Sequence, residues 1–224
     1  KSGTKKDKIL VIQPFGRSVN QVGPAVYDAT SRSIESSNVV SIMEKLRTEY
    51  GILVMSQVPI DISENEDHPI AVPKEPNLRL WAAMIHNADH FLGCDSVGQH
   101  IVKALNKTAT VVIGSTYPIN ISYPDDKDFD IIDVGKDKRV YSPIRLTMDD
   151  ERDRANNDCI VMDEKEIQLV VDSVKKRMGK GKKFEGTVEK HVHTNKCNHD
   201  DSSNYTKASP VKIPEGLKLM EEQG

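Results

Sequence analysis

Cysteine is scarce in this sequence and cannot provide a disulfide framework. The 224 residues include only Cys94, Cys159 and Cys197, an odd and widely spaced set that fits a reducing compartment. No apolar run approaches the roughly 20 residues of a membrane-spanning helix. The basic residues at the start are not followed by the apolar segment of a signal peptide. We therefore expect a cytoplasmic protein, or one peripheral to the inner membrane face.

The sequence also lacks an excess of positive charge. Its 31 Lys and Arg residues stand against 34 Asp and Glu residues, for a formal net charge of -3. No overall positive field is available to hold a polyanion, so nucleic acid is not expected as a partner. Aromatic residues make up 5% and hydrophobic residues 37% of the chain, which is enough for one moderate core. The chain begins with Lys1 and not with Met, so we expect a fragment, a processed product or an incomplete sequence.

Short apolar runs alternate with helical periodicities along most of the chain. Buried strands are predicted at residues 9–13, 52–55, 70–72, 91–92, 109–113 and 129–134. Helices are predicted at residues 39–50, 77–87, 97–105 and 164–178. This order predicts the α/β class with a Rossmann-like, doubly wound and mostly parallel sheet. Residues 14–33 carry no periodicity and predict a long functional loop.

The composition changes near both ends of the chain. Residues 1–8 are predicted to be a polar linker, and residues 9–178 a single Rossmann-like domain. Residues 179–224 are rich in Lys, Glu, Asn, Ser and Pro, so we expect a tail that is disordered or extended as a docking arm. Ser36 or Ser37 is expected to cap the first helix, Asp163 the last, and Trp81 is expected in the core.

In open α/β sheets, ligands bind beyond the carboxyl ends of the strands. The loops that follow the predicted strands are rich in small, hydroxyl and basic residues, as a phosphate-bearing ligand requires. The sharpest of these segments is 95–100, where Asp95 or Ser96 can cap a helix whose first N–H groups would face an anion. Gly98 would allow close backbone approach. Taken alone, this segment is better explained as ordinary N-cap chemistry, because Asp-Ser before a helix is a common cap.

The segment around residues 95–100 resembles a known signature. Residues 88–118, ADHFLGCDSVGQHIVKALNKTATVVIGSTYP, are similar to the C-terminal nucleotide-sugar-binding domain of the family 9 glycosyltransferases, the heptosyltransferase-like enzymes. The resemblance extends over residues 8–178 and implies one half of a GT-B fold. Val97 and Gly98 depart from the family, which usually has Gly and often Pro at these places.

The resemblance implies inverting transfer of a sugar from a nucleotide-diphosphate donor of the ADP-heptose type onto lipopolysaccharide or another glycan. The donor-binding residues that it implies are Arg17, Arg32, Asp95, Ser96, Gly98, His100, Ser115 and Thr116. Of the two arginines, either can neutralise the charge that grows on the leaving diphosphate. No metal or other cofactor is implied. The acceptor site and the usual catalytic base belong to the other GT-B half, so no catalytic residue is nominated.

Two other functions remain open from the sequence. One is a non-catalytic interaction or structural module of the same fold, held in a larger assembly through residues 179–224. Such a partner could also be an N-terminal GT-B half. The other is a different Rossmann-like nucleotide-binding enzyme, although no Gly-x-Gly-x-x-Gly follows the first strand. The residue types of His191, His193, Cys197 and His199 suit zinc, but the cluster lacks a paired Cys-x-x-Cys and a surrounding core, so a metal site is not predicted.

Overall fold

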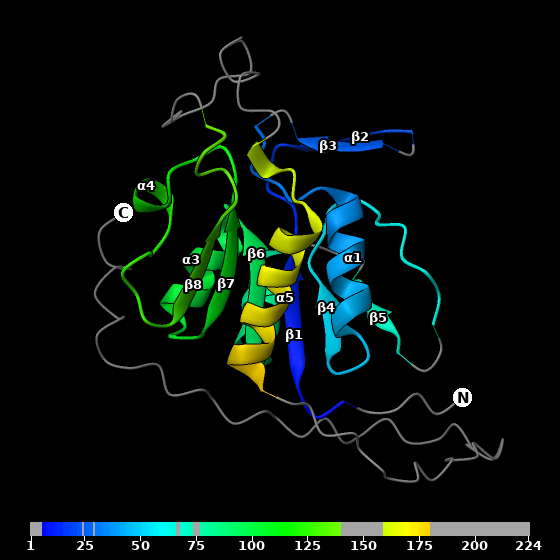
Figure 1. Ribbon diagram of the computed structural model, residues 1–224. Helices are drawn as coiled ribbons and strands as arrows, with labels where there is room; N and C mark the ends of the chain where they lie inside the picture. The colour runs from blue at the N-terminus through cyan, green and yellow to red at the C-terminus, as the bar shows by residue number, and fades with distance from the viewer. Residues whose placement is uncertain are drawn as a thin grey trace, which may run out of the picture. The chain divides into compact units, whose positions relative to one another are not determined.

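The computed structural model describes residues 6–23, 25–28, 30–65, 68–73, 77–139 and 159–179. Its centre is a six-stranded sheet in the order β5-β4-β1-β6-β7-β8, and every neighbouring pair of strands is parallel (Figure 1). The six strands are β1 (Ile9–Gln13), β4 (Gly51–Val54), β5 (Ile70–Ala71), β6 (His90–Cys94), β7 (Ala109–Ile113) and β8 (Phe129–Asp133).

The strand order reverses between β1 and β6. Counted along the chain, the six strands lie in the order 3-2-1-4-5-6, which is that of a doubly wound nucleotide-binding sheet. β1 pairs on one side with β4 and on the other with β6, where Ile12 lies opposite Leu92. The structure confirms the predicted α/β class and parallel sheet. It also extends the strand that was predicted at residues 91–92 to five residues.

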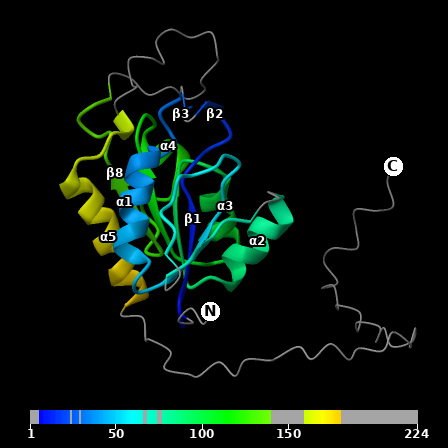
Figure 2. The same cartoon turned by 90° about the vertical axis from the view of Figure 1, so that its right-hand side faces the viewer.

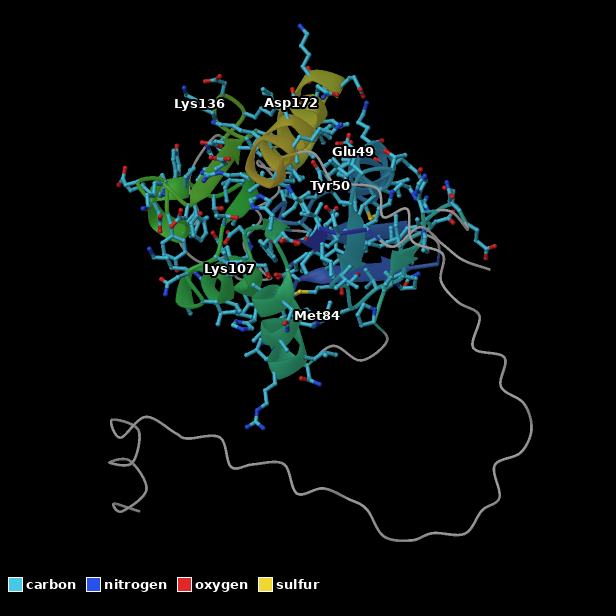
Figure 3. The ribbon with its side chains drawn as sticks, turned by 90° about the horizontal axis from the view of Figure 1, so that it is seen from below. Glu49, Tyr50, Met84, Lys107, Lys136 and Asp172 are labelled. Carbon is cyan, nitrogen blue, oxygen red and sulfur yellow. The ribbon has the colours of Figure 1, made fainter. Side chains whose placement is uncertain are left out.

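Two pairs of helices cover the two faces of the sheet (Figure 2). α1 (Ser36–Leu46) and α5 (Glu164–Met178) lie on one face, and α2 (Leu78–Asn87) and α3 (Val97–Ala104) on the other. Seen from below, Tyr50 and Asp172 lie on the side of the first pair, and Met84 and Lys107 on the opposite side (Figure 3). A short helix, α4 (Pro118–Ile121), follows β7.

β1 is buried on both faces, which explains its uninterrupted apolar sequence. Leu10 and Ile12 belong to the core beneath α1 and α5, while Val11 belongs to the core beneath α2 and α3. Trp81 of α2 is 7% exposed and packs in the second core, as predicted.

The helix ends agree only partly with expectation. Asp163 caps α5 in a capping box with Glu166, and Gly179 ends the helix at a φ of 64°, both as predicted. The predicted cap of α1 was wrong, because Glu35 occupies the N-cap position without a side-chain cap and Ser36 is already the first helical residue. α1 also ends at Leu46 and not at residue 50.

The predicted loop at residues 14–33 contains a β-hairpin. β2 (Val19–Val22) pairs antiparallel with β3 (Ala25–Asp28), and Gly23 at the connection has a φ of 58°. A left-handed residue at such a turn favours glycine, which has no Cβ to clash. The prediction missed this hairpin because β2 is largely exposed and shows no apolar alternation.

Several sequence predictions fall on residues outside the described ranges. They include the tail at 180–224, the His191, His193, Cys197 and His199 cluster, and the first five residues. Among the helices of the described ranges, none has both the length and the apolar composition needed to cross a membrane.

Candidate ligand cavity at the strand-order reversal

A cavity of about 560 Å³ opens at the carboxyl ends of β1, β4 and β6. We call it the switch-point cavity, because the sheet order reverses there and ligands of doubly wound folds bind at such points. Five of the eight candidate residues line it, namely Arg17, Arg32, Asp95, Ser96 and His100. Apolar lining comes from other elements, chiefly Met55 after β4 and Leu78 and Trp81 of α2.

Two arginines from the β1–α1 connection face the cavity. The Arg32 side chain is 34% exposed, and its Nη1 lies 4.0 Å from an oxygen of Asp95. Arg32 Nε donates to the Thr30 hydroxyl at 3.2 Å, and Nη2 lies 3.5 Å from the Ser18 hydroxyl. Arg17 is exposed and forms no hydrogen bond or ion pair within the described part of the chain. One guanidinium is therefore held in place and the other is free to move.

Asp95 lies at the back of the cavity and is 7% exposed. The Thr116 hydroxyl donates to its Oδ2 at 3.0 Å, and Gln99 Nε2 donates to its Oδ1 at 3.4 Å. Burial raises the pKa of Asp95, while the Thr116 hydrogen bond and the Arg32 charge act in the opposite direction. The Asp95 carboxylate thus faces Arg32, while Thr116 and Gln99 bind its two oxygens from within the protein.

The start of α3 is occupied by a side chain of β1. Gly98 N–H donates to Gln13 Oε1 at 2.8 Å, and Gln13 Nε2 donates to the Ser96 hydroxyl at 3.0 Å. A Cβ at Gly98 would lie 2.2 Å from Gln13 Oε1 and 2.5 Å from the Phe91 ring. The expectation that Gly98 admits a ligand therefore needs correction, because the close approach is to Gln13 and Phe91. Ser96 occupies the N-cap position but its hydroxyl makes no capping bond, and Asp95 makes none either.

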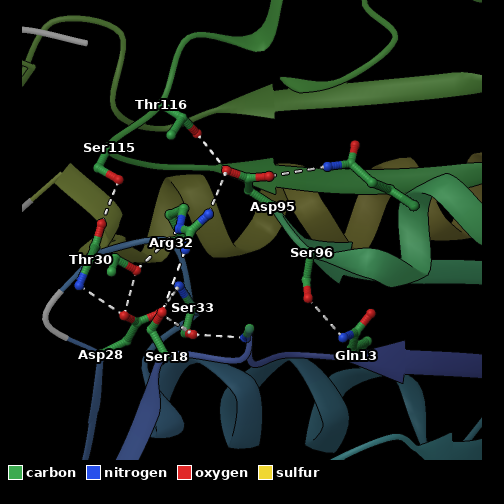
Figure 4. A network of polar contacts seen from close by, with 12 residues as sticks. Gln13, Ser18, Asp28, Thr30, Arg32, Ser33, Asp95, Ser96, Ser115 and Thr116 are labelled. Atoms are coloured by element: carbon green, nitrogen blue, oxygen red, sulfur yellow. Dashed lines mark hydrogen bonds and ion pairs between the residues drawn. The ribbon is translucent and has the colours of Figure 1, made fainter. Parts of the chain in front are cut away.

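Ser115 and Thr116 lie behind the cavity and do not line it. They are 0% and 4% exposed. The Ser115 hydroxyl donates to the carbonyl oxygen of Thr30 at 2.6 Å, and the Thr116 hydroxyl donates to Asp95. Both hydroxyls are therefore used to join the loop after β7 to the loops that carry Arg32 and Asp95 (Figure 4).

His100 lies one turn into α3 and is exposed at the cavity edge. Its Nδ1 shares a hydrogen bond of 2.9 Å with the Tyr123 hydroxyl, and the two rings meet edge to face at 5.8 Å. Tyr123 thus fixes the ring, and Nε2 is the nitrogen left for a ligand.

Sequence reasoning missed three residues that shape the cavity, Gln13, Asp28 and Arg139. Asp28 of β3 accepts hydrogen bonds from the backbone N–H groups and hydroxyls of Thr30 and Ser33. Ser33 in turn accepts the N–H of Gly16 at 2.9 Å. The hydrogen-bond partners of Gln13 and Arg139 are distant in sequence, and the contacts of Asp28 depend on the hairpin. Of the three residues, Gln13 alone gave a local signal, because it is a polar residue at the end of a buried strand.

A second cavity of about 360 Å³ lies on the other side of the hairpin base, lined in part by Tyr27, Asp28, Ile34 and Glu35. None of its described lining residues is a lysine or arginine, so these residues offer no cation to a phosphate. In neither cavity, nor elsewhere in the described ranges, do three His, Cys, Asp or Glu side chains come together as a metal centre needs.

Neither a protein-family model nor a curated protein matches the sequence. Among solved structures, the chain is similar to Escherichia coli ADP-heptose lps heptosyltransferase II, with a TM-score of 0.52 and 12% identity over 76% of this chain and 46% of that one. Escherichia coli heptosyltransferase WaaC with ADP gives a TM-score of 0.44 with 10% identity over 76% and 45% of the two chains. The iron-containing dodecameric glycosyltransferase TibC from enterotoxigenic Escherichia coli gives 0.41 with 11% identity over 75% and 46%.

The chain spans less than half the length of each of these three proteins. The likeness to heptosyltransferase II shows a shared fold, so the described residues have the fold of part of a glycosyltransferase of the heptosyltransferase type.

Proposed function

We propose that the switch-point cavity binds the nucleotide-diphosphate part of a sugar donor, and that the chain is the donor-binding part of a glycosyltransferase. One observation carries the proposal: Arg17 and Arg32 face the same cavity where the sheet order reverses. Heptosyltransferase II, whose fold is similar, is named for ADP-heptose and for lipopolysaccharide. We extend that chemistry to this chain as a donor of the ADP-heptose type and a glycan or lipid-linked glycan acceptor.

The lining offers complementary chemistry for both parts of such a donor. Two guanidinium groups match the negative charge and oxygen geometry of a diphosphate. The Leu78 side chain, which is 59% exposed, and the Trp81 ring offer apolar surface for a nucleobase, and Gln57 adds an amide that can bond to its polar edges. The volume of about 560 Å³ lies within the usual range of ligand sites, roughly 300 to 1,000 Å³.

The reaction would be an inverting displacement. An acceptor hydroxyl forms a bond to the anomeric carbon as the bond from that carbon to the diphosphate oxygen breaks, and the electron pair stays on the diphosphate. Arg32 and Arg17 stabilise the charge that develops there. The hydroxyl proton passes to a base outside the described residues, which we place, with the acceptor site, in a further half of the enzyme.

One observation favours a second candidate, a non-catalytic module of the same fold. The N–H of Gly98 and the carboxylate of Asp95, which the family resemblance assigns to the donor, are both satisfied by groups of this chain. A protein that no longer binds a donor could keep these contacts for stability alone.

Tryptophan fluorescence separates the two candidates. Trp81 is the single tryptophan of the sequence and lines the cavity, so its emission reports occupancy directly. Titration with ADP, UDP and GDP, and with the matching nucleosides, should show one diphosphate that saturates at least about tenfold more tightly than its nucleoside. If the Trp81 emission does not change with any nucleotide or nucleotide sugar up to millimolar concentration, donor binding is contradicted. The non-catalytic module is then the remaining candidate.

A further inference from the structure

Arg139 is a buried arginine that no part of the proposed chemistry uses directly. Its side chain is 1% exposed, and Nη2 forms a fork with the two Asp133 oxygens at 2.6 Å each. Nη1 donates to the carbonyl oxygen of Gly114 at 3.0 Å and to that of Thr116. The guanidinium also lies 4.6 Å from the centre of the Tyr117 ring. One side chain thus holds the loop 114–116 to the end of β8.

Loop 114–116 reaches Arg32 by two routes. In the first, the Thr116 hydroxyl donates to Asp95, and Asp95 lies 4.0 Å from the Arg32 guanidinium. In the second, the Ser115 hydroxyl donates to the Thr30 carbonyl, while the Thr30 hydroxyl accepts from Arg32 Nε. Both routes start on loop 114–116, whose Gly114 and Thr116 carbonyl oxygens accept from Arg139. Figure 4 shows that both end on the Arg32 guanidinium.

We infer that Arg139 is a positioning residue, which fixes loop 114–116 and through it the direction in which Arg32 faces the cavity. The inference deepens the proposed function and rests on it for its effect on ligands, since an aligned Arg32 would bind the diphosphate. A planar guanidinium suits this role, because its Nη1 and Nη2 hold two carbonyls and a carboxylate at once. A lysine could not make the same set of contacts.

The test compares Arg139→Met with a matched variant elsewhere. Arg177→Met removes another arginine fork, from Asp130 at 2.6 and 2.7 Å, in the amino-terminal half of β8 and away from the cavity. Both substitutions delete a guanidinium and take the arginine partner from an aspartate, so the general effect of charge is shared. Arg177 is 22% exposed and Arg139 1%, so the stability of each variant is measured by urea denaturation before the comparison. Asp133→Asn is the second variant, because it weakens the fork while the Arg139 side chain stays in place.

The first readout does not depend on a ligand. The Nε–Hε cross-peak of Arg32 in a ¹H–¹⁵N spectrum is identified by its loss in Arg32→Gln. It should shift and broaden in Arg139→Met and Asp133→Asn and stay unchanged in Arg177→Met. An Arg32 signal that is unmoved in folded Arg139→Met or Asp133→Asn would overturn the inference.

The second readout is the affinity for ADP by Trp81 fluorescence. Arg139→Met should lower the affinity for ADP by about tenfold, the size of one charge-assisted hydrogen bond. The affinity for adenosine should stay unchanged. Combined with Arg32→Gln, Arg139→Met should cost no further affinity, because both changes remove the same contact. Additive losses, or equal losses for adenosine, would contradict a role through Arg32. If the wild-type chain binds no nucleotide while the Arg32 signal still responds, the proposed function fails and the positioning role stands.

Discussion

The Arg32 guanidinium lies 4.0 Å from the Asp95 carboxylate at the back of the switch-point cavity. That separation is longer than a hydrogen bond, so the two charges attract without using up the donors of Arg32. Burial raises the pKa of Asp95 by more than the Thr116 hydrogen bond and the Arg32 charge lower it. Arg32 therefore keeps N–H groups that can bind a diphosphate, and Asp95 restrains it without closing the site.

Arg32→Gln and Arg17→Gln should each weaken binding of a nucleoside diphosphate by about 10- to 100-fold, because hydrogen bonds to charged groups contribute about 1.5 to 3 kcal/mol. The matching nucleoside should bind unchanged. Isothermal titration calorimetry at two salt concentrations measures both affinities.

The matched control for these arginines is Arg79→Gln. Arg79 is exposed on α2 next to Leu78, carries the same charge and does not line the cavity. It should change the affinity less than about twofold, because exposed charges are largely screened by salt. A loss as large as that of Arg32→Gln would show that the general field of the protein, and not direct contact, governs binding.

Gly16, which lines the cavity, and Gly98, which packs on Gln13 and Phe91, should respond differently to the same added methyl group. In Gly98→Ala, the Cβ would lie 2.2 Å from Gln13 Oε1 and 2.5 Å from the Phe91 ring, so the free energy of unfolding should fall by about 1 to 3 kcal/mol. In Gly16→Ala, the nearest atoms are 3.8 Å away, and stability should change by less than about 0.5 kcal/mol. Urea denaturation of the two variants measures both values, and equal stabilities would contradict the packing of α3 on Gln13.

His90 should make the protein sensitive to acid. Its ring is 1% exposed between the hydroxyls of Thr108 and Thr110, and burial, followed by the Arg177 charge, lowers its pKa to about 4. In the unfolded chain the pKa of His90 is 6.5. Between pH 4 and pH 6.5 the unfolded state therefore binds more protons than the folded state. The stabilisation is complete above about pH 6.5 and is lost as the pH falls toward 4, by up to about 3 kcal/mol.

The control for this pH dependence is His90→Asn, which keeps a polar side chain without a titrating group. From pH 7 to pH 4, the wild type should lose up to about 3 kcal/mol of unfolding free energy relative to the variant. Parallel pH profiles would mean that His90 is not held neutral in the folded protein.

The centre of the sheet was predictable because β1, β6 and β7 are buried. Leu10, Val11 and Ile12 form a continuous apolar run whose side chains enter both cores, and the same rule found the other parallel strands. The hairpin was missed because the β2 side chains face mostly solvent, so no apolar pattern marks the strand. The Gly23-Pro24 pair in the sequence was a local sign of its turn.

The candidate site was predicted in its location but not in its contacts. Arg32, Asp95 and Ser96 follow buried strands in the sequence, which predicts that they lie at the same edge of the sheet. The structure has all three in the lining of one cavity. What each polar group bonds to depends on tertiary neighbours. Gln13 is 85 residues from Gly98, and Arg139 is 25 from Gly114. No local pattern could show that these residues use the groups expected to contact a ligand.

The most direct test of the central claim is to map ADP onto the protein by NMR. In ¹H–¹⁵N spectra of the wild-type chain, saturating ADP should move the Trp81 indole signal and the backbone signals of Gly16 and Ser96, and leave those of Tyr27 and Ile34 at the second cavity unmoved. Adenosine at the same concentration should leave Gly16 and Ser96 unmoved. Shifts centred on Tyr27 and Ile34, or none at millimolar ADP, UDP, GDP and ADP-heptose, would contradict a nucleotide-diphosphate site in the switch-point cavity.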